Sequence, residues 1–224
     1  RLPFSFSYRC TRIRMQPIPS QLLCYVSTDY GNVPPKKMLA DIDAYIELYG
    51  QDACDGIFFD ETPSTSELTE QYRGYYGKAT DEGLESVFNP GLAGDPAFFD
   101  FSGSSDASRL PVSVVSVEYY YTLVRKNGMP WPPPQADASQ NVLLLHSATE
   151  LYTGGSTNKD LLSAVVKKAS CAGWGHIYIT DDLMENPWDK RPNFWDDMVE
   201  AAYNPPADSG ACPDAPDSPL RIMV

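Results

Sequence analysis

Two adjacent carboxylates, Asp60 and Glu61, stand directly after a short apolar run at residues 56–59. A run of this length, with glycine before it and Thr-Pro-Ser after it, predicts a strand buried on both faces, as in a parallel sheet. Functional side chains in such sheets gather at the carboxyl ends of the strands. The carboxylate pair is therefore the first candidate site, suited to acid–base or nucleophilic chemistry. The alternative is that one of the two acids caps the helix that follows.

The same pattern recurs along the chain, at intervals of about 30 residues, the length of one strand-plus-helix unit. Five further apolar runs end on polar residues, at 22–28, 84–89, 112–118, 142–146 and 176–181. In an open doubly wound sheet only the strands at the switch point need functional ends, whereas all strands of a (β/α)8 barrel end at one mouth. Six polar strand ends therefore predict an α/β fold of the (β/α)8 TIM-barrel type.

A third carboxylate, Glu118, ends the run at 112–117 and is followed by three tyrosines. A carboxyl group among aromatic side chains is partly desolvated, which favours the protonated form that a general acid needs. Glu118 is therefore the predicted general acid, and Asp60 its predicted partner. The alternative is a partly exposed glutamate at the start of the next helix.

Neutral side chains at two strand ends are predicted to bind substrate together with Glu61. Asn89 stands before Pro90-Gly91, and its amide offers a donor and an acceptor to a sugar hydroxyl, although such an asparagine also stabilises turns. Tyr25 offers an aromatic face for a pyranose ring, although it also suits an ordinary core position.

Two further candidates come from the last predicted strands. His146 ends the run at 142–146, and it could bond substrate, orient a carboxylate or be a core histidine with its bonds satisfied. Asp181 follows the run at 176–180, beside a second acid, Asp182, and is predicted to bind substrate. The same three side chains leave open a metal-dependent hydrolase or deacetylase.

Helical patterns separate the apolar runs. Pro34-Pro35 and Gly50 mark the start and the stop of a helix over 35–49. Further helices are predicted from 64 through 76, where Ser64 and Glu67 have capping-box spacing, from 157 to 169, and from 194 to 203.

The length of 224 residues fits one α/β domain. A complete eight-unit barrel needs about 250 residues, so the six units found predict a barrel without its first two strands. The barrel domain is predicted over 21–203. Residues 1–20 are an unassigned segment with no recognisable leader, and 204–224 are rich in Pro, Asp, Gly and Ser and are predicted to be a disordered tail.

Charge and cysteine content narrow the function classes. The net charge of -13 would repel nucleic acid. The cysteines show no CxxC pair, so neither a structural zinc site nor any cofactor is predicted. Buried thiols are expected at Cys24, Cys54 and Cys171. Cys10 could form a disulfide with Cys212 in an oxidising compartment. No apolar run is long enough for a membrane span.

Five sequence blocks resemble, in order and spacing, the motifs of the spherulin-4-like (spherulation-specific) family. The blocks are Tyr25-Val26-Ser27-Thr28-Asp29-Tyr30-Gly31, residues 55–61, Val87-Phe88-Asn89-Pro90-Gly91, residues 115–118, and residues 178–182 with Asn186-Pro187-Trp188. The resemblance covers about residues 20–203. It implies a (β/α)8 barrel and a secreted or cell-surface glycoside hydrolase that cuts α-1,4-linked N-acetylgalactosamine or galactosamine stretches of exopolysaccharide. It also implies Asp60, Asn89 and Glu118 as the functional trio.

Glycoside cleavage needs one carboxylic acid to protonate the departing oxygen and one carboxylate at C1. Glu118 takes the first role in this hypothesis and Asp60 the second, as nucleophile or charge stabiliser. The alternative within the same fold is a noncatalytic cell-surface or spore-coat protein that binds glycan, which would hold oligosaccharide without releasing reducing ends.

Overall fold

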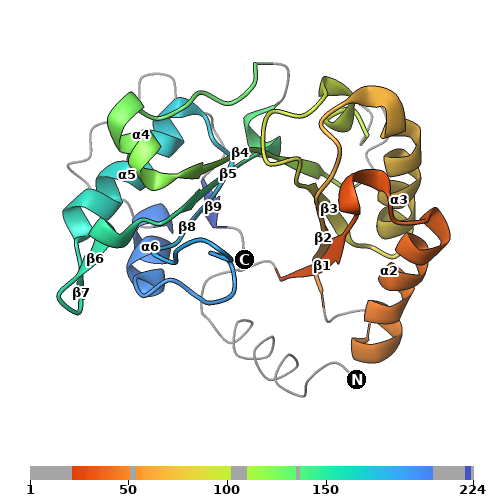
Figure 1. Cartoon of the computed structure of the whole chain (residues 1–224), viewed down its shortest axis with the longest axis horizontal. Helices are drawn as coiled ribbons and strands as arrows, with labels where there is room; N and C mark the ends of the chain where they lie inside the picture. Colours follow the sequence, from red (N-terminus) through yellow and green to blue (C-terminus); the bar gives the residue numbers. More distant parts are fainter. Residues whose placement is uncertain (1–21, 51–53, 102–109, 135–136, 204–219, 223–224) are drawn as a thin grey trace. The chain divides into compact units, whose positions relative to one another are not determined.

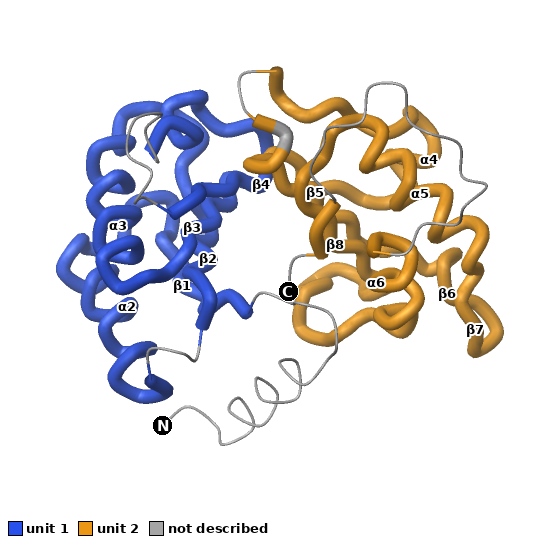
Figure 2. The backbone as a smooth tube through the Cα atoms, turned by 180° about the vertical axis from the view of Figure 1, so that it is seen from behind, with its two compact units in different colours: residues 1–115, 223–224 blue, residues 116–222 orange. Residues whose placement is uncertain are grey.

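The computed structural model describes residues 22–50, 54–101, 110–134, 137–203 and 220–222 (Figure 1). The chain divides into two compact units (Figure 2), one made of Arg1–Val115 with Met223–Val224 and the other of Ser116–Ile222. No helix within the described ranges has both the length and the apolar character needed to cross a bilayer.

The first unit is built on parallel strands hydrogen-bonded in chain order. These are β1 (Leu23–Ser27), β2 (Gly56–Asp60), β3 (Glu85–Phe88) and the first part of β4 (Val112–Tyr120). Ser27 pairs with Asp60, and Phe59 pairs with Phe88. The carboxyl ends of β1, β2 and β3 are therefore level, which places the residues that follow them side by side.

Two helices, α2 (Pro35–Tyr49) and α3 (Thr69–Asp81), run along this part of the sheet (Figure 1). The predicted helix over 35–49 is confirmed: proline lies in its first turn, and Gly50, with φ of 87°, ends it. In β2, Ile57 and Phe59 are buried while Phe58 and Asp60 are half-buried. The prediction that β2 is buried on both faces was therefore wrong, and the less buried face carries Asp60.

Stacked aromatic rings form the core between α3 and the strands. The ring of Phe88 lies 5.0 Å from that of Phe59, 5.6 Å from that of Phe98 and 5.5 Å from that of Phe101. Tyr72 meets the same group edge-on, 5.9 Å from Phe88. Edge-to-face and offset pairs at these distances are favourable beyond the area that they bury.

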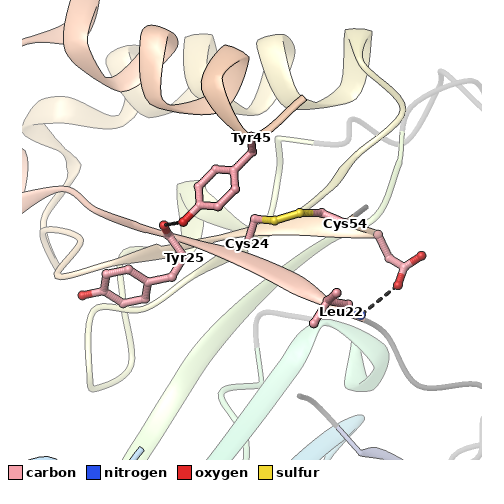
Figure 3. Close-up of a disulfide and its surroundings, with 6 residues drawn as sticks. Leu22, Cys24, Tyr25, Tyr45 and Cys54 are labelled. Atoms are coloured by element: carbon pink, nitrogen blue, oxygen red, sulfur yellow. Dashed lines mark hydrogen bonds between the residues drawn. A yellow bond between two sulfur atoms is a disulfide. The ribbon is translucent and has the colours of Figure 1, made fainter. Parts of the chain in front are cut away.

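A disulfide between Cys24 and Cys54 joins β1 to the segment that leads into β2 (Figure 3). Nearby, Tyr45 reaches from α2 and donates its hydroxyl to the carbonyl oxygen of Tyr25 over 2.7 Å. Cys171 is disulfide-bonded as well. The prediction of three buried thiols was therefore wrong, because a single sequence does not show which cysteines come within bonding distance. Cys10 and Cys212 lie outside the described residues.

The second unit continues from the last part of β4. It contains β5 (Asn141–His146), β8 (His176–Ile179) and β9 (Arg221–Ile222), with β5, β8 and β9 paired in parallel. Its helices are α4 (Tyr121–Asn127), α5 (Lys159–Ala172) and α6 (Trp195–Tyr203), and α5 packs against α6. A two-stranded hairpin joins β6 (Tyr152–Thr153) to β7 (Ser156–Thr157). Strand β9 lies within 204–224, which was predicted to be a disordered tail, and was therefore not predicted; residues 204–219 and 223–224 lie outside the described residues.

Short 3-10 helices complete the described elements: Asp29–Gly31, Ser66–Leu68, Pro96–Phe98, Ala138–Gln140 and Thr149–Leu151. The second of these precedes α3. The capping box predicted for Ser64 and Glu67 does not form, since Glu67 accepts instead from the hydroxyl of Thr65.

All six strands predicted from the apolar runs are present, but the (β/α)8 barrel without its first two strands was a wrong prediction. Among the described residues, the main sheet has the hydrogen-bonded order β1-β2-β3-β4-β5-β8-β9, so β1 and β9 are its edge strands and do not pair with each other. A barrel requires strands closed into a ring. The described residues also do not show a helix after every strand, because the described part of the β3–β4 connection holds only the 3-10 helix Pro96–Phe98. Polar strand ends show where strands stop and not which strands pair.

Removing the first disulfide should destabilise the fold. The bond links residues 30 positions apart, and loop closure of that length contributes about 3–4 kcal/mol by restricting the unfolded chain. We expect Cys24→Ala with Cys54→Ala to lower the free energy of unfolding by this amount, as measured by denaturant titration. An unchanged stability relative to wild type under the same non-reducing conditions would contradict the prediction.

His176, at the start of β8, should make stability depend on pH. Burial, and then the charge of Arg221 on β9, lower the pKa of His176 from its usual 6.5 to about 4. Between these values the unfolded chain binds a proton that the folded chain does not, so the free energy of unfolding should fall as the pH drops from about 6.5 to about 4. We expect this residue to account for about 2 kcal/mol between pH 8 and pH 5.

The matched comparison is His176→Phe measured at both pH values. At pH 8 the histidine of wild type and the phenylalanine of the variant are both neutral, so the difference in their free energies of unfolding gives the packing cost alone. The variant should then lose less stability than wild type on going to pH 5, and an equal loss in both proteins would show that His176 does not titrate as described.

Candidate functional site

The Asp60 carboxylate, at the end of β2, is held by both neighbouring strands. Its Oδ2 accepts from the hydroxyl of Tyr25 on β1 over 2.9 Å, and its Oδ1 accepts from Nδ2 of Asn89 over 2.8 Å. Asn89 directly follows β3. Each carboxylate oxygen therefore has a neutral donor, and the plane of the carboxylate is fixed. The cap alternative is wrong, because the N-cap residues of the following helices are Thr65 and Leu68.

The turn after β3 determines how the Asn89 amide points. Its Oδ1 accepts from the backbone N–H of Gly91 over 2.8 Å, which directs Nδ2 toward Asp60. Gly91 has a φ of 73°, a conformation that glycine adopts without a steric penalty. Asn89 is buried, with 7 % of its surface exposed. Its contact with the carboxylate identifies an orienting role, and its predicted contact with substrate stays a prediction.

Tyr25 is half open to solvent, with 50 % of its surface exposed, so it is not an ordinary core tyrosine. Its ring stacks on Phe58, with centroids 6.4 Å apart. Burial of the hydroxyl, the hydrogen bond to Asp60 and the nearby negative charges raise the pKa of Tyr25. The phenol therefore keeps its proton and remains a donor to the carboxylate.

Glu61 lies where the chain turns out of β2, with a φ of 54°. A non-glycine residue in this region is strained unless its surroundings hold it there. Three donors do so: the Glu61 carbonyl accepts from Thr28 Oγ1 over 2.7 Å and from the Tyr30 N–H over 2.7 Å, and Oε2 accepts from Ser27 Oγ over 2.5 Å. Asp60 and Glu61 thus hydrogen-bond to different residues of β1 and do not form one symmetric pair.

Glu118 lies in β4 of the second unit and is half-buried. Its Oε1 accepts from the indole Nε1–H of Trp188 over 3.2 Å. The helix α4 begins at Tyr121, so the alternative in which Glu118 opens that helix is wrong. The sequence-based pairing of Glu118 with Asp60 stays a prediction.

His146, at the end of β5, is 5 % exposed and packs among aromatic rings. Its ring centroid lies 4.3 Å from that of Tyr120 and 5.7 Å from that of Trp188. Nδ1 is 3.0 Å from Ser147 Oγ. Burial lowers the pKa of His146, which favours the neutral ring at neutral pH. These contacts fit a packed histidine beside Trp188, and its predicted contact with substrate stays a prediction.

Asp181 and Asp182 follow β8 and are engaged with the chain itself. Asp181 accepts from the backbone N–H of Asn193 over 3.1 Å and from its Nδ2 over 2.6 Å. Asp182 forms a 2.6 Å ion pair with Lys190, which is the largest cause of its lowered pKa. Within the described ranges, no group of three or more His, Cys, Asp or Glu side chains is arranged to hold a metal ion.

Comparison with known proteins decides the family. The family model of spherulation-specific family 4 (Spherulin4) matches residues 12–202. The chain belongs to this family. Searches of curated proteins and of solved structures found no match.

Two sets of predicted site residues emerge in this Spherulin4 chain. Tyr25, Asp60, Glu61 and Asn89 come together at the carboxyl ends of β1–β3. In the second unit, Glu118 and His146 share contacts with Trp188. Sequence reasoning placed Trp188 in a family motif but not in the site. It also missed Ser27, although its position two residues after Tyr25 puts both on one face of β1.

Changing Asn89 to aspartate should destabilise this Spherulin4 chain at neutral pH. The substitution replaces a donor with a second carboxylate beside Asp60, which leaves the acceptor unsatisfied and adds like-charge repulsion. We expect a loss of about 1–3 kcal/mol in the free energy of unfolding at pH 7. The loss should shrink as the pH falls, because like-charge repulsion between adjacent carboxylates favours proton uptake by one of them, which can then donate to the other.

Asn89→Ala is the matched control, because it removes the donor without adding charge. Its destabilisation should be relieved by acid less than that of Asn89→Asp, because it comes from the lost hydrogen bond to Asp60 alone and includes no like-charge repulsion. Parallel pH curves for the two variants would contradict the contact with Asp60.

Proposed function

We propose that the chain is a glycoside hydrolase that cleaves α-1,4-linked N-acetylgalactosamine or galactosamine polysaccharide of the galactosaminogalactan type. Membership of the Spherulin4 family supports this proposal, as does the supply of carboxylates at strand ends. Glycosidic bonds are cut by one carboxyl group that protonates the leaving oxygen and one that acts at the anomeric carbon.

The observation that carries the proposal is the arrangement around Asp60. The carboxylate is fixed by a phenol and an amide, Tyr25 and Asn89, and it takes part in no ion pair among the described residues. A carboxylate held by neutral donors keeps its negative charge for a positively charged transition state, whereas a neighbouring cation would neutralise it. This suits a nucleophile or a stabiliser of an oxocarbenium-like sugar.

Glu118 takes the role of acid and base in this proposal. In its protonated form it transfers a proton to the glycosidic oxygen as the bond to C1 breaks, and its carboxylate then takes a proton from the attacking water. The half-buried position of Glu118 beside Trp188 supports this role.

A secreted or cell-surface location belongs to the same proposal. Cys24 and Cys54 are bridged, and Cys171 is disulfide-bonded too. Disulfides persist in oxidising compartments and are rare in the cytosol, which supports action on a polysaccharide outside the cell.

Replacing either carboxylate should remove the activity and keep the fold. We expect Asp60→Asn and Glu118→Gln each to lower the release of reducing ends from galactosaminogalactan by about 10²–10⁴-fold, the usual contribution of an acid–base group. The amides preserve size and shape, so thermal unfolding should stay close to wild type. The measurement is a reducing-end assay over a range of polymer concentrations.

Asp196→Asn and Glu47→Gln are matched controls, because both acids are exposed on helices and the substitutions make the same charge change. They should retain full activity. Full activity in Asp60→Asn and Glu118→Gln would remove the assignment. A wild-type protein that binds the polymer and releases no reducing ends would point to the noncatalytic alternative.

A further inference from the structure

Trp188 links Glu118 to an aromatic cluster in the second unit. Its indole Nε1–H donates to Glu118 Oε1 over 3.2 Å. Its ring lies edge-on to His146 at 5.7 Å and against Tyr178 at 6.0 Å, and Tyr178 in turn packs against Trp195 at 6.2 Å. Residues of β5 and β8 therefore pack directly against this indole, and α6 supports it indirectly through Tyr178.

The loop that carries Trp188 is tied at both of its ends. Asp181 receives two hydrogen bonds from Asn193, and Asp182 forms its ion pair with Lys190. The carbonyl of Asp182 also accepts from the N–H of Ser147, next to His146, over 2.9 Å. These bonds hold the two ends of the 181–193 loop in place, and Trp188 lies between them in the sequence.

We propose that Trp188 is a positioning residue for Glu118 and that the 181–193 loop holds it in place. An indole N–H is only a donor, so Oε1 must act as an acceptor in both protonation states of the carboxyl group. The exchangeable proton of Glu118 is therefore directed to Oε2. The consequence for catalysis rests on the proposed function, whereas the contact itself does not.

Glu118 is the titratable side chain that accepts the indole N–H of Trp188. His146 and Tyr178 pack against the indole ring, and the loop itself carries further charged side chains: Asp181, Asp182, Glu185, Asp189, Lys190 and Arg191. Burial lowers the pKa of His146 and raises that of Tyr178. Both are therefore neutral at neutral pH.

The test is the indole N–H signal of Trp188 in ¹H–¹⁵N spectra followed over pH. The chain has four tryptophans, and loss of one signal in Trp188→Phe assigns it. We expect this signal to shift as Glu118 ionises and to lose that shift in Glu118→Gln. A signal that titrates unchanged in Glu118→Gln overturns the proposal, and loss of the shift in His146→Phe instead would assign the titration to His146 and overturn it as well.

Trp188→Phe keeps a ring for packing and removes the donor. A hydrogen bond to a charged group is worth about tenfold in an equilibrium, so the pKa of Glu118, read from its ¹³C-labelled carboxyl, should rise by about one pH unit. Under the proposed function, the alkaline limb of kcat/KM should move up equally, with KM within about twofold of wild type.

Trp195→Phe is the matched control, because it changes a neighbouring ring that packs on Tyr178. It should leave the pKa of Glu118 in place, and an equal rise in both variants would show a general packing effect and overturn the proposal. If wild type releases no reducing ends while the carboxyl still responds to Trp188→Phe, the glycosidase proposal fails and the positioning role stands.

Discussion

The level register of three parallel strands is the constraint on which the first unit depends. Ser27 pairs with Asp60 and Phe59 with Phe88, so β1, β2 and β3 deliver their last residues to the same edge. Asp60 can then accept from Tyr25 on one side and Asn89 on the other. A slip of one residue in β2 would turn Asp60 to the face that packs against the helices and would bury its charge.

The two units hold their carboxylates by different means. Around Asp60 the positions come from hydrogen bonds between adjacent strands, reinforced by the turn at Glu61 that Thr28 and Tyr30 stabilise. Around Glu118 they come from ring packing, because Trp188 is fixed by His146 and Tyr178 and offers a single N–H. The first arrangement is set mainly by strand register, and the second also needs the 181–193 loop.

Local features of the sequence were enough to find the elements and most of the residues at their ends. Apolar runs located six strands, and Pro35 and Gly50 bracketed α2. The predictions that failed concern contacts between residues that are far apart in the sequence. The pairing of Cys24 with Cys54, the strand order that replaced the barrel, and the short strand β9 all need tertiary contacts that apolar runs and spacing do not report. The role of Trp188 was missed for a related reason, because this residue lies in a loop and its proposed role depends on its contact with Glu118.

The hydrogen-bond donors differ between the candidate carboxylates and other acids of this chain, which has a net charge of -13. Lysines pair with acids on surface helices and loops, such as Asp41, Asp182 and Asp197. The contacts to Asp60 and Glu118 described above come instead from a phenol, an amide and an indole. Neutral donors orient a carboxylate without cancelling its charge, and they have no charge of their own to lose over the pH range in which a carboxyl group exchanges its proton. Among the contacts described, lysines hold acids of helices and loops, whereas neutral donors orient Asp60 and Glu118.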